Sequence, residues 1–331
     1  MTFKSATLAA AAALLVSIGT TATAQDYSVV YVMSDNLGDM GFNDNAATGF
    51  RRAEQDGVSV RMLQASPSDP QLWLQNIEAV SSSGDWDIIF TGPNMHDYLA
   101  QVAPEYPDQK YVFFDDELDA PNVLSVKYAQ NEGSFLAGAL AALAATDTEN
   151  FPLSDGDPEI AVVAGMDLPV IQDFILGFKQ GAASAVPDID VQVIFIGSFN
   201  DAQKAYDLSA TAIENGANVV YNVAGPAGLG ILKAAADKGK YAIGVDSDQN
   251  GLHPDNILAS MLKQIGNSIY DSINQIRADD AEFGTLKVYG LANSGVGLVF
   301  NDALVPQEVQ DRVAALGAAV ASGEVTVDSA F

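Results

Sequence analysis

The chain has 331 residues, with 43 acidic and 15 basic side chains and no cysteine, which gives a formal net charge of −28 at neutral pH. This charge repels nucleic-acid phosphates and anionic lipid, so nucleic acid is excluded as a partner and the acidic side chains are expected to form a solvated surface. The absence of cysteine excludes disulfides, thiolate metal sites and a cysteine nucleophile.

The first 24 residues have the pattern of a secretory signal peptide. Lys4 precedes the apolar run LAAAAALLVSIG, and the small residues ATA form a cleavage pattern directly before Gln25. A membrane anchor is the alternative, but this run is shorter than the roughly 20 residues that a spanning helix needs. We therefore expect a periplasmic protein, cleaved between Ala24 and Gln25, that is not a lipoprotein because it has no cysteine to acylate.

Apolar runs alternate with amphipathic stretches in the first part of the mature chain. The amphipathic stretches predict helices over 43–55 and 69–83. The apolar runs predict strands over 27–33, 58–63, 87–92, 111–115 and 122–128. Strands separated by helices indicate a parallel, doubly wound sheet.

The same alternation restarts after a helix of small apolar residues predicted over 131–146. Its strands are expected over 159–165, 191–197, 218–225 and 241–245. Two successive units of this kind predict an α/β protein with two Rossmann-like lobes.

The junctions near 128 and 250 have the appearance of short crossover strands of a hinge. We expect a first lobe of residues 25–127 plus about 253–281. The second lobe is then expected to comprise 128–252 plus about 282–331.

Unusual polar clusters follow the predicted strands. They include SDNLGDMGFND at 34–44, DDELD at 115–119, GSFND at 197–201 and DSDQ at 246–249. Ligands of open α/β sheets bind beyond the carboxyl ends of the strands, so we expect the site there.

Two of these polar loops hold a single bulky aromatic residue, Phe42 and Phe199. A ring beside Asp35 and Asn43 suits stacking on a planar ligand, and the alternative for Phe42 is packing beneath its own loop. Two such rings at facing strand ends would clamp a flat base, with each stacked base worth about 1–3 kcal/mol.

Asp246 and Lys263 are expected to act as a pair. A carboxylate at a strand end can accept hydrogen bonds from both hydroxyls of a vicinal diol, and an ammonium can donate to the same oxygens while compensating the buried charge. This chemistry suits ribose or another sugar, and a structural salt bridge at the hinge is the alternative. Asp248 is expected to be a turn or cap residue.

The remaining motifs do not indicate an enzyme. VAGPAGLG at 223–230 departs from GxGxxG and has no Walker Lys-Ser/Thr, so it is expected to be a helix N-terminus facing the ligand. The two histidines, His96 and His253, show no metal spacing, and no GxSxG elbow occurs. We expect no catalytic residues, no metal and no cofactor.

A set of motifs, taken in order, resembles the basic membrane protein (BMP) family. The motifs are GFND, NEGSFLAGALAA, GMDLP with FILGFKQGA, the run from IGSFND to GILKAA, and YAIGVDSDQ with ILASMLK, and they cover nearly the whole mature chain. This family comprises the PnrA-like substrate-binding proteins of ABC transporters, several of which bind purine nucleosides. The resemblance implies a type I periplasmic-binding-protein fold, with two lobes joined by a multi-strand hinge.

The resemblance also implies a nucleoside site at the strand ends. Phe42 and Phe199 would sandwich the base, and Asn43 and Asp115 would address its polar edge. Asp35, in the same loop as Phe42, would also contact the ligand.

Asp246 and Lys263 would hold the ribose hydroxyls. The implied function is capture of a purine nucleoside and its delivery to an inner-membrane ABC permease. We expect the protein to be a monomer. A sugar- or diol-binding protein of the same fold and an exported nucleoside-processing enzyme are the alternatives.

Overall fold

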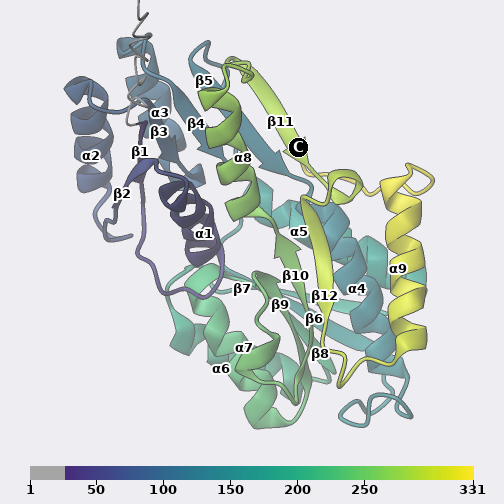
Figure 1. The fold of residues 1–331 in the computed structure, drawn as a ribbon. Coiled ribbons are helices and arrows are strands. Elements are labelled where there is room, and N and C mark those ends of the chain that lie inside the picture. The colour runs from purple at the N-terminus through teal and green to yellow at the C-terminus, as the bar shows by residue number, and fades with distance from the viewer. Residues whose placement is uncertain (1–26) are drawn as a thin grey trace, which may run out of the picture.

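The computed structural model describes residues 27–331, so the signal peptide expected at residues 1–24 lies outside the described residues. Residues 27–331 form two lobes, each built on one six-stranded sheet flanked by helices (Figure 1). No helix in this range is long and apolar enough to cross a membrane.

The first lobe contains a fully parallel sheet in the order β2-β1-β3-β4-β5-β11. Its strands are β1 (Ser28–Val32), β2 (Ser59–Leu63), β3 (Ile88–Thr91), β4 (Tyr111–Phe114), β5 (Val123–Tyr128) and β11 (Thr285–Tyr289). The helices of this lobe are α1 (Phe42–Gln55), α2 (Pro70–Ser83), α3 (His96–Val102) and α8 (Ile265–Arg277).

The second lobe repeats this arrangement in the order β7-β6-β8-β9-β10-β12, with β12 antiparallel to β10. Its strands are β6 (Glu159–Ala164), β7 (Asp190–Phe195), β8 (Val219–Val223), β9 (Tyr241–Asp246), β10 (Ile257–Lys263) and β12 (Val296–Phe300). Its helices are α4 (Gln130–Thr146), α5 (Pro169–Ala185), α6 (Ala202–Glu214), α7 (Gly228–Lys238) and α9 (Gln307–Ala321). The strand intervals expected from the sequence are confirmed to within two residues.

Strand residues alternate between two apolar layers, as their period of two requires. In β1, Val30 and Val32 pack into the cluster that contains Ile77 of α2, whereas Val29 lies in the cluster that contains Phe50 of α1. Both faces of the first sheet are therefore covered, which explains why its strands read as continuous apolar runs.

The chain crosses between the two sheets three times within residues 27–331. The crossings lie between β5 and α4, between β10 and α8, and between β11 and β12. Residues 253–281 were expected in the first lobe and 282–331 in the second. This division is wrong for two strands, because β10 belongs to the second sheet and β11 to the first. An apolar run predicts a strand, but its periodicity does not show which of two sheets it joins.

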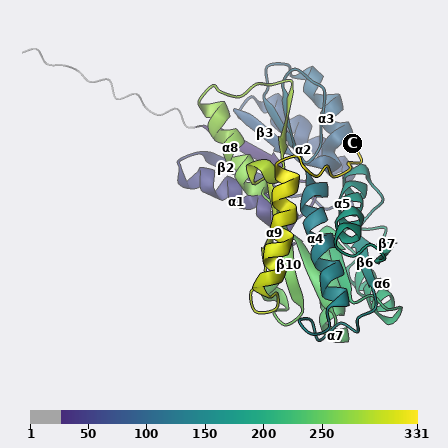
Figure 2. The same ribbon diagram turned by 90° about the vertical axis from the view of Figure 1, so that its right-hand side faces the viewer.

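Helices α4 and α5 lie side by side in the second lobe and approach closely (Figure 2). A Cβ atom at Gly177 would lie 2.0 Å from the backbone oxygen of Asn131, and one at Gly181 would lie 1.8 Å from that of Phe135. The small residues of α4 and the glycines of α5 therefore set the distance between the two helices.

We expect Gly177→Ala to destabilise the fold by about 1–3 kcal/mol, because the added methyl group meets backbone atoms that move only with the whole helix. Urea unfolding followed by circular dichroism measures this loss. Gly297→Ala is the control, because a Cβ there meets no atom within 4 Å. Equal stability of Gly177→Ala and the wild type would contradict the close packing.

Candidate functional site

The loops that follow β1 and β9 meet between the two lobes. The Ser247 hydroxyl donates to the backbone oxygen of Gly41 at 3.3 Å, and the Gln249 amide donates to that of Met40 at 3.1 Å. The carboxyl ends of both sheets therefore face a common interface, which is where ligands bind in open α/β folds.

Asp39 fixes the start of α1 and with it Phe42. Its carboxylate accepts backbone N–H bonds from Gly41 at 3.1 Å, Asn43 at 2.7 Å and Asp44 at 3.0 Å. These donors lie at or just before the first turn of the helix, where they have no partner within the helix. Asp39 is therefore a capping residue.

Phe42 is partly buried and stacks on Phe114, with the ring centroids 5.8 Å apart. Phe114 was not a candidate from the sequence, although it is the last residue of β4 and directly precedes Asp115. Asn43 is buried, and its side-chain oxygen accepts a hydrogen bond from the Tyr31 hydroxyl at 3.5 Å. The loop after β1 therefore combines an aromatic face with a nearby amide.

A buried ion pair between Lys263 and Asp115 joins the lobes. Lys263 ends β10 in the second sheet, Asp115 follows β4 in the first, and both side chains are less than one tenth exposed. The Lys263 ammonium also lies 5.1–5.7 Å from the ring centroids of Phe42, Tyr128 and Phe174. Burial raises the pKa of Asp115 above its ordinary value, and the positive charge of Lys263 opposes this shift.

The alternative of a structural salt bridge between Asp246 and Lys263 is therefore wrong, whereas a joint role of the two residues in ligand binding stays a prediction. Asp246 and Lys263 end neighbouring strands of the same sheet, with Asp246 in register with Leu262, so they do not approach the ligand from opposite lobes. Asp115 supplies the carboxylate of the first lobe. Both carboxylates follow buried strands, and the sequence alone does not show which one reaches the lysine.

Asp246 is a largely buried carboxylate that forms no salt bridge with any residue of 27–331. It is 6% exposed, and its side-chain oxygens accept no hydrogen bond from any residue of 27–331. Burial raises its pKa from 3.8 to about 7, and Asp115 and Asp39 add to the rise while Lys263 opposes it. Such a group suits a ligand that donates hydrogen bonds to it.

Asp115 and Asp246 occupy equivalent places in the two lobes, at the ends of β4 and β9, the fourth strands of the two sheets. Both have positive φ angles, 67° and 65°. Such backbone costs about 1–3 kcal/mol in a residue other than glycine and is concentrated at binding and catalytic sites.

Phe199 follows β7 in the second lobe and packs against Gly165, where a Cβ atom would lie 2.2 Å from the ring. No ring contact between Phe199 and Phe42 occurs among the described residues. Burial raises the pKa of Asp35, and the backbone N–H of Asn36 and the side chain of Asn200, which follows Phe199, oppose this rise. Phe42 lies in the first lobe and Phe199 in the second, so each lobe carries one of the two expected rings.

Other expectations concern residues beside the site. Asp248 is exposed and accepts the backbone N–H of Asn250 at 3.0 Å, which confirms the expected turn. His96 pairs with Asp116 at 2.8 Å. Within residues 27–331, no group of three or more His, Cys, Asp or Glu side chains is arranged to hold a metal ion.

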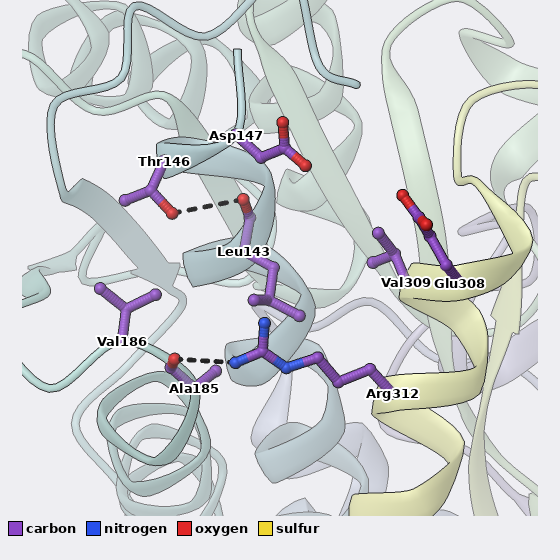
Figure 3. A pocket seen from close by; sticks show the side chains of 8 residues that line it. All are labelled: Leu143, Thr146, Asp147, Ala185, Val186, Glu308, Val309 and Arg312. Carbon is purple, nitrogen blue, oxygen red and sulfur yellow. Dashed lines mark hydrogen bonds between the residues drawn. The ribbon is translucent and has the colours of Figure 1, made fainter. Parts of the chain in front are cut away.

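A surface cavity of about 400 Å³ lies where α4, α5 and α9 come together (Figure 3). It is lined by the last turns of α4 and α5, whereas the strand ends lie near the first turns of these helices. Its Arg312 side chain already donates to the backbone oxygen of Ala185 at 3.2 Å. We therefore place the candidate site at the strand ends and not in this cavity.

Comparison with known families identifies the family of the chain. Residues 27–328 match the family model described as ABC transporter substrate-binding protein PnrA-like (Bmp). The chain belongs to this family. The predicted resemblance and the type I fold are both confirmed.

Named relatives cover most of the chain. Basic membrane protein A1 of Borrelia garinii subsp. bavariensis is 27% identical over 90% of this chain and 87% of its own length. The ABC transporter nucleoside-binding protein BmpA of Lactococcus lactis subsp. cremoris is 28% identical over 89% of this chain and 87% of its own length. A crystal structure of an ABC transporter solute-binding protein from Aeropyrum pernix K1 superposes with a TM-score of 0.81 at 25% identity, covering 92% of this chain and 93% of that one.

We expect Asp246→Asn to gain stability relative to the wild type as the pH rises. Between about pH 4 and pH 7 the folded wild type keeps a proton on Asp246 that the unfolded chain has lost, so this group lowers the free energy of unfolding as the pH increases. Asparagine does not titrate and tolerates positive φ. The free energy of unfolding of Asp246→Asn minus that of the wild type should therefore increase by up to a few kcal/mol from pH 4 to pH 8.

Urea unfolding at both pH values measures this change. Asp248→Asn, at the exposed turn two residues away, is the control. A pH-independent difference between Asp246→Asn and the wild type would show that Asp246 ionises normally in the folded protein.

Proposed function

We propose that the protein captures a purine nucleoside between its lobes and delivers it to an ABC permease of the inner membrane. The observation that carries this proposal is the unpartnered buried carboxylate of Asp246 beside the Lys263–Asp115 ion pair. It supplies an acceptor for sugar hydroxyls next to aromatic rings that suit a base. The name of the Lactococcus relative, a nucleoside-binding protein, supports the same ligand class.

In the proposed complex the base lies between Phe42 and Phe199. Asn43 and Asp115 address its polar edge, and Asp35 closes the same side from the loop after β1. Aromatic faces bind purines and pyrimidines through stacking, which tolerates several bases.

The ribose lies over the end of the second sheet. Asp246 accepts hydrogen bonds from the two hydroxyls, and Lys263 donates to the same oxygens while its ammonium stays paired with Asp115. This arrangement would give Asp246 the hydrogen-bond donors that it lacks within the protein.

The charge of the site favours an uncharged ligand. Asp35, Asp115 and Asp246 are partly or fully buried here, and Lys263 is already paired. A phosphate group would meet carboxylates without a free cation, so we propose that nucleotides are rejected.

The signal-peptide pattern of residues 1–24 supports a proposal about the cellular setting. We propose that the chain acts as a periplasmic monomer after cleavage of its signal peptide, without a lipid anchor because it has no cysteine. We also propose that it performs no chemical step, as expected for a substrate-binding protein. Incubation with inosine, followed by chromatography for free hypoxanthine, tests the alternative of a nucleoside-processing enzyme.

We expect inosine to bind more tightly than 2′-deoxyinosine, hypoxanthine or inosine 5′-monophosphate in isothermal titration. Losing one hydroxyl leaves a buried carboxylate oxygen short of a donor, which costs about 1–3 kcal/mol. Asp246→Asn should remove most of the preference for inosine over hypoxanthine.

Inosine affinity should also fall as the pH drops below 7, because the pKa of Asp246 lies at about 7 and its ionised form is the better acceptor.

Equal affinity for inosine and hypoxanthine would contradict a ribose site at Asp246. Binding of free sugars without any nucleoside binding would instead support the sugar- or diol-binding alternative.

We expect Phe42→Ala and Phe199→Ala each to weaken inosine binding by about 1–3 kcal/mol with little loss of stability, because each would remove one stacking face. Phe283→Ala is the matched control, since this ring is also partly buried but precedes β11 at the amino end of the first sheet. Titration calorimetry gives the affinities and thermal unfolding gives the stability. Wild-type affinity in both site variants would rule out the clamp.

A further inference from the structure

One amide side chain of the first lobe contacts the backbone at the ends of β9 and β10. Asn45, in the first turn of α1, donates from its side-chain nitrogen to the backbone oxygen of Asp246 at 2.8 Å and to that of Lys263 at 3.0 Å. The same nitrogen lies 3.3 Å from the Ser247 hydroxyl. Its side-chain oxygen accepts the backbone N–H of Gly266 at 2.9 Å.

These contacts occupy both N–H donors and the oxygen of the amide. Asn45 is therefore committed to the protein backbone, in contrast to the side chains that we propose to face the ligand. The two carbonyl groups that it holds belong to Asp246 and Lys263, the residues proposed to bind the ribose.

The backbone at these positions requires such support. Asp246 has a φ angle of 65°, and a strained conformation of this kind persists only where surrounding contacts enforce it. Lys263 is the last residue of β10 before the chain crosses to α8, so its carbonyl lies at the boundary between the lobes. A single amide thus connects the end of β9, the end of β10 and the start of α8.

We propose that Asn45 is a positioning residue that holds Asp246 and Lys263 in the geometry that recognises the ribose of the ligand. This inference rests on the proposed nucleoside function and adds to it a residue that does not touch the nucleoside. It makes the preference for a ribonucleoside over its free base depend on a contact made by the opposite lobe.

A second asparagine provides a matched control. The side-chain nitrogen of Asn122 donates to three backbone oxygens, those of Ala103, Tyr106 and Gln109, at 3.0–3.1 Å. All of these residues belong to the first lobe, and Asn122 directly precedes β5 at the amino end of the sheet. Asn45→Asp and Asn122→Asp therefore remove the same kind of donor, but only the first change affects the candidate site.

The first experiment measures the ratio of inosine to hypoxanthine affinity by isothermal titration at pH 8, with Asn45→Ala as a second variant that adds no charge. We expect both Asn45 variants to reduce this ratio by about tenfold or more, since Asp246 and Lys263 would no longer be aligned with the ribose hydroxyls. Hypoxanthine affinity should change by less than about threefold, and Asn122→Asp should keep the wild-type ratio. Equal losses for inosine and hypoxanthine, or an unchanged ratio in both Asn45 variants, would overturn the inference.

The second experiment needs no ligand. Hydrogen exchange measured by mass spectrometry should show faster exchange in Asn45→Asp than in the wild type for peptides covering 244–249 and 262–267, whereas Asn122→Asp should change only peptides around 103–122. Unchanged exchange in 244–249 and 262–267 would overturn the positioning role whatever the ligand is. A wild type that binds no nucleoside would overturn the proposed function, and the exchange result alone would then decide whether Asn45 orders these strand ends.

Discussion

The buried ion pair between Asp115 and Lys263 is the interaction on which the arrangement of the site depends. It places a buried charge from each lobe at their interface, so each group depends on the other for compensation. Removing one partner of such a pair costs about 3–5 kcal/mol, because the remaining charge stays buried. Lys263 of the second lobe forms its ion pair with Asp115 of the first lobe. Asp246 therefore has no counter-charge of its own.

The equivalence of β4 and β9 explains how two carboxylates come to lie at this interface. The two sheets repeat one strand order, so the residues that follow the fourth strand of each lie at corresponding points. Asp115 and Asp246 both leave their strands with a positive φ angle, yet only Asp115 meets a lysine. The repeat therefore supplies two similar groups, and the single ammonium makes them different.

The apolar runs predicted nine of the twelve described strands to within two residues, whereas β10, β11 and β12 were not predicted. Parallel pairing brings the carboxyl ends of strands to one edge, which is why the site was expected there. The sequence did not predict that Lys263 pairs with Asp115, since Asp115 and Asp246 have the same sequence context. It also misplaced 257–263, because an apolar run carries no information about which of two sheets it joins. Asn45 was missed for a similar reason: its contacts are more than 200 positions away along the chain.

Burial makes the charged form of Asp246 costly in the folded protein, as its raised pKa indicates. Any ligand that donates to Asp246 removes that cost, so the hydroxyl groups contribute more to affinity than the same bonds would in water. The effect depends on ionisation, because a protonated Asp246 no longer needs a donor and the pKa of about 7 places this change near neutral pH. The selectivity for a hydroxylated ligand that we propose and the pH dependence that we expect therefore have one physical origin, the burial of a carboxylate beside a lysine that is already paired.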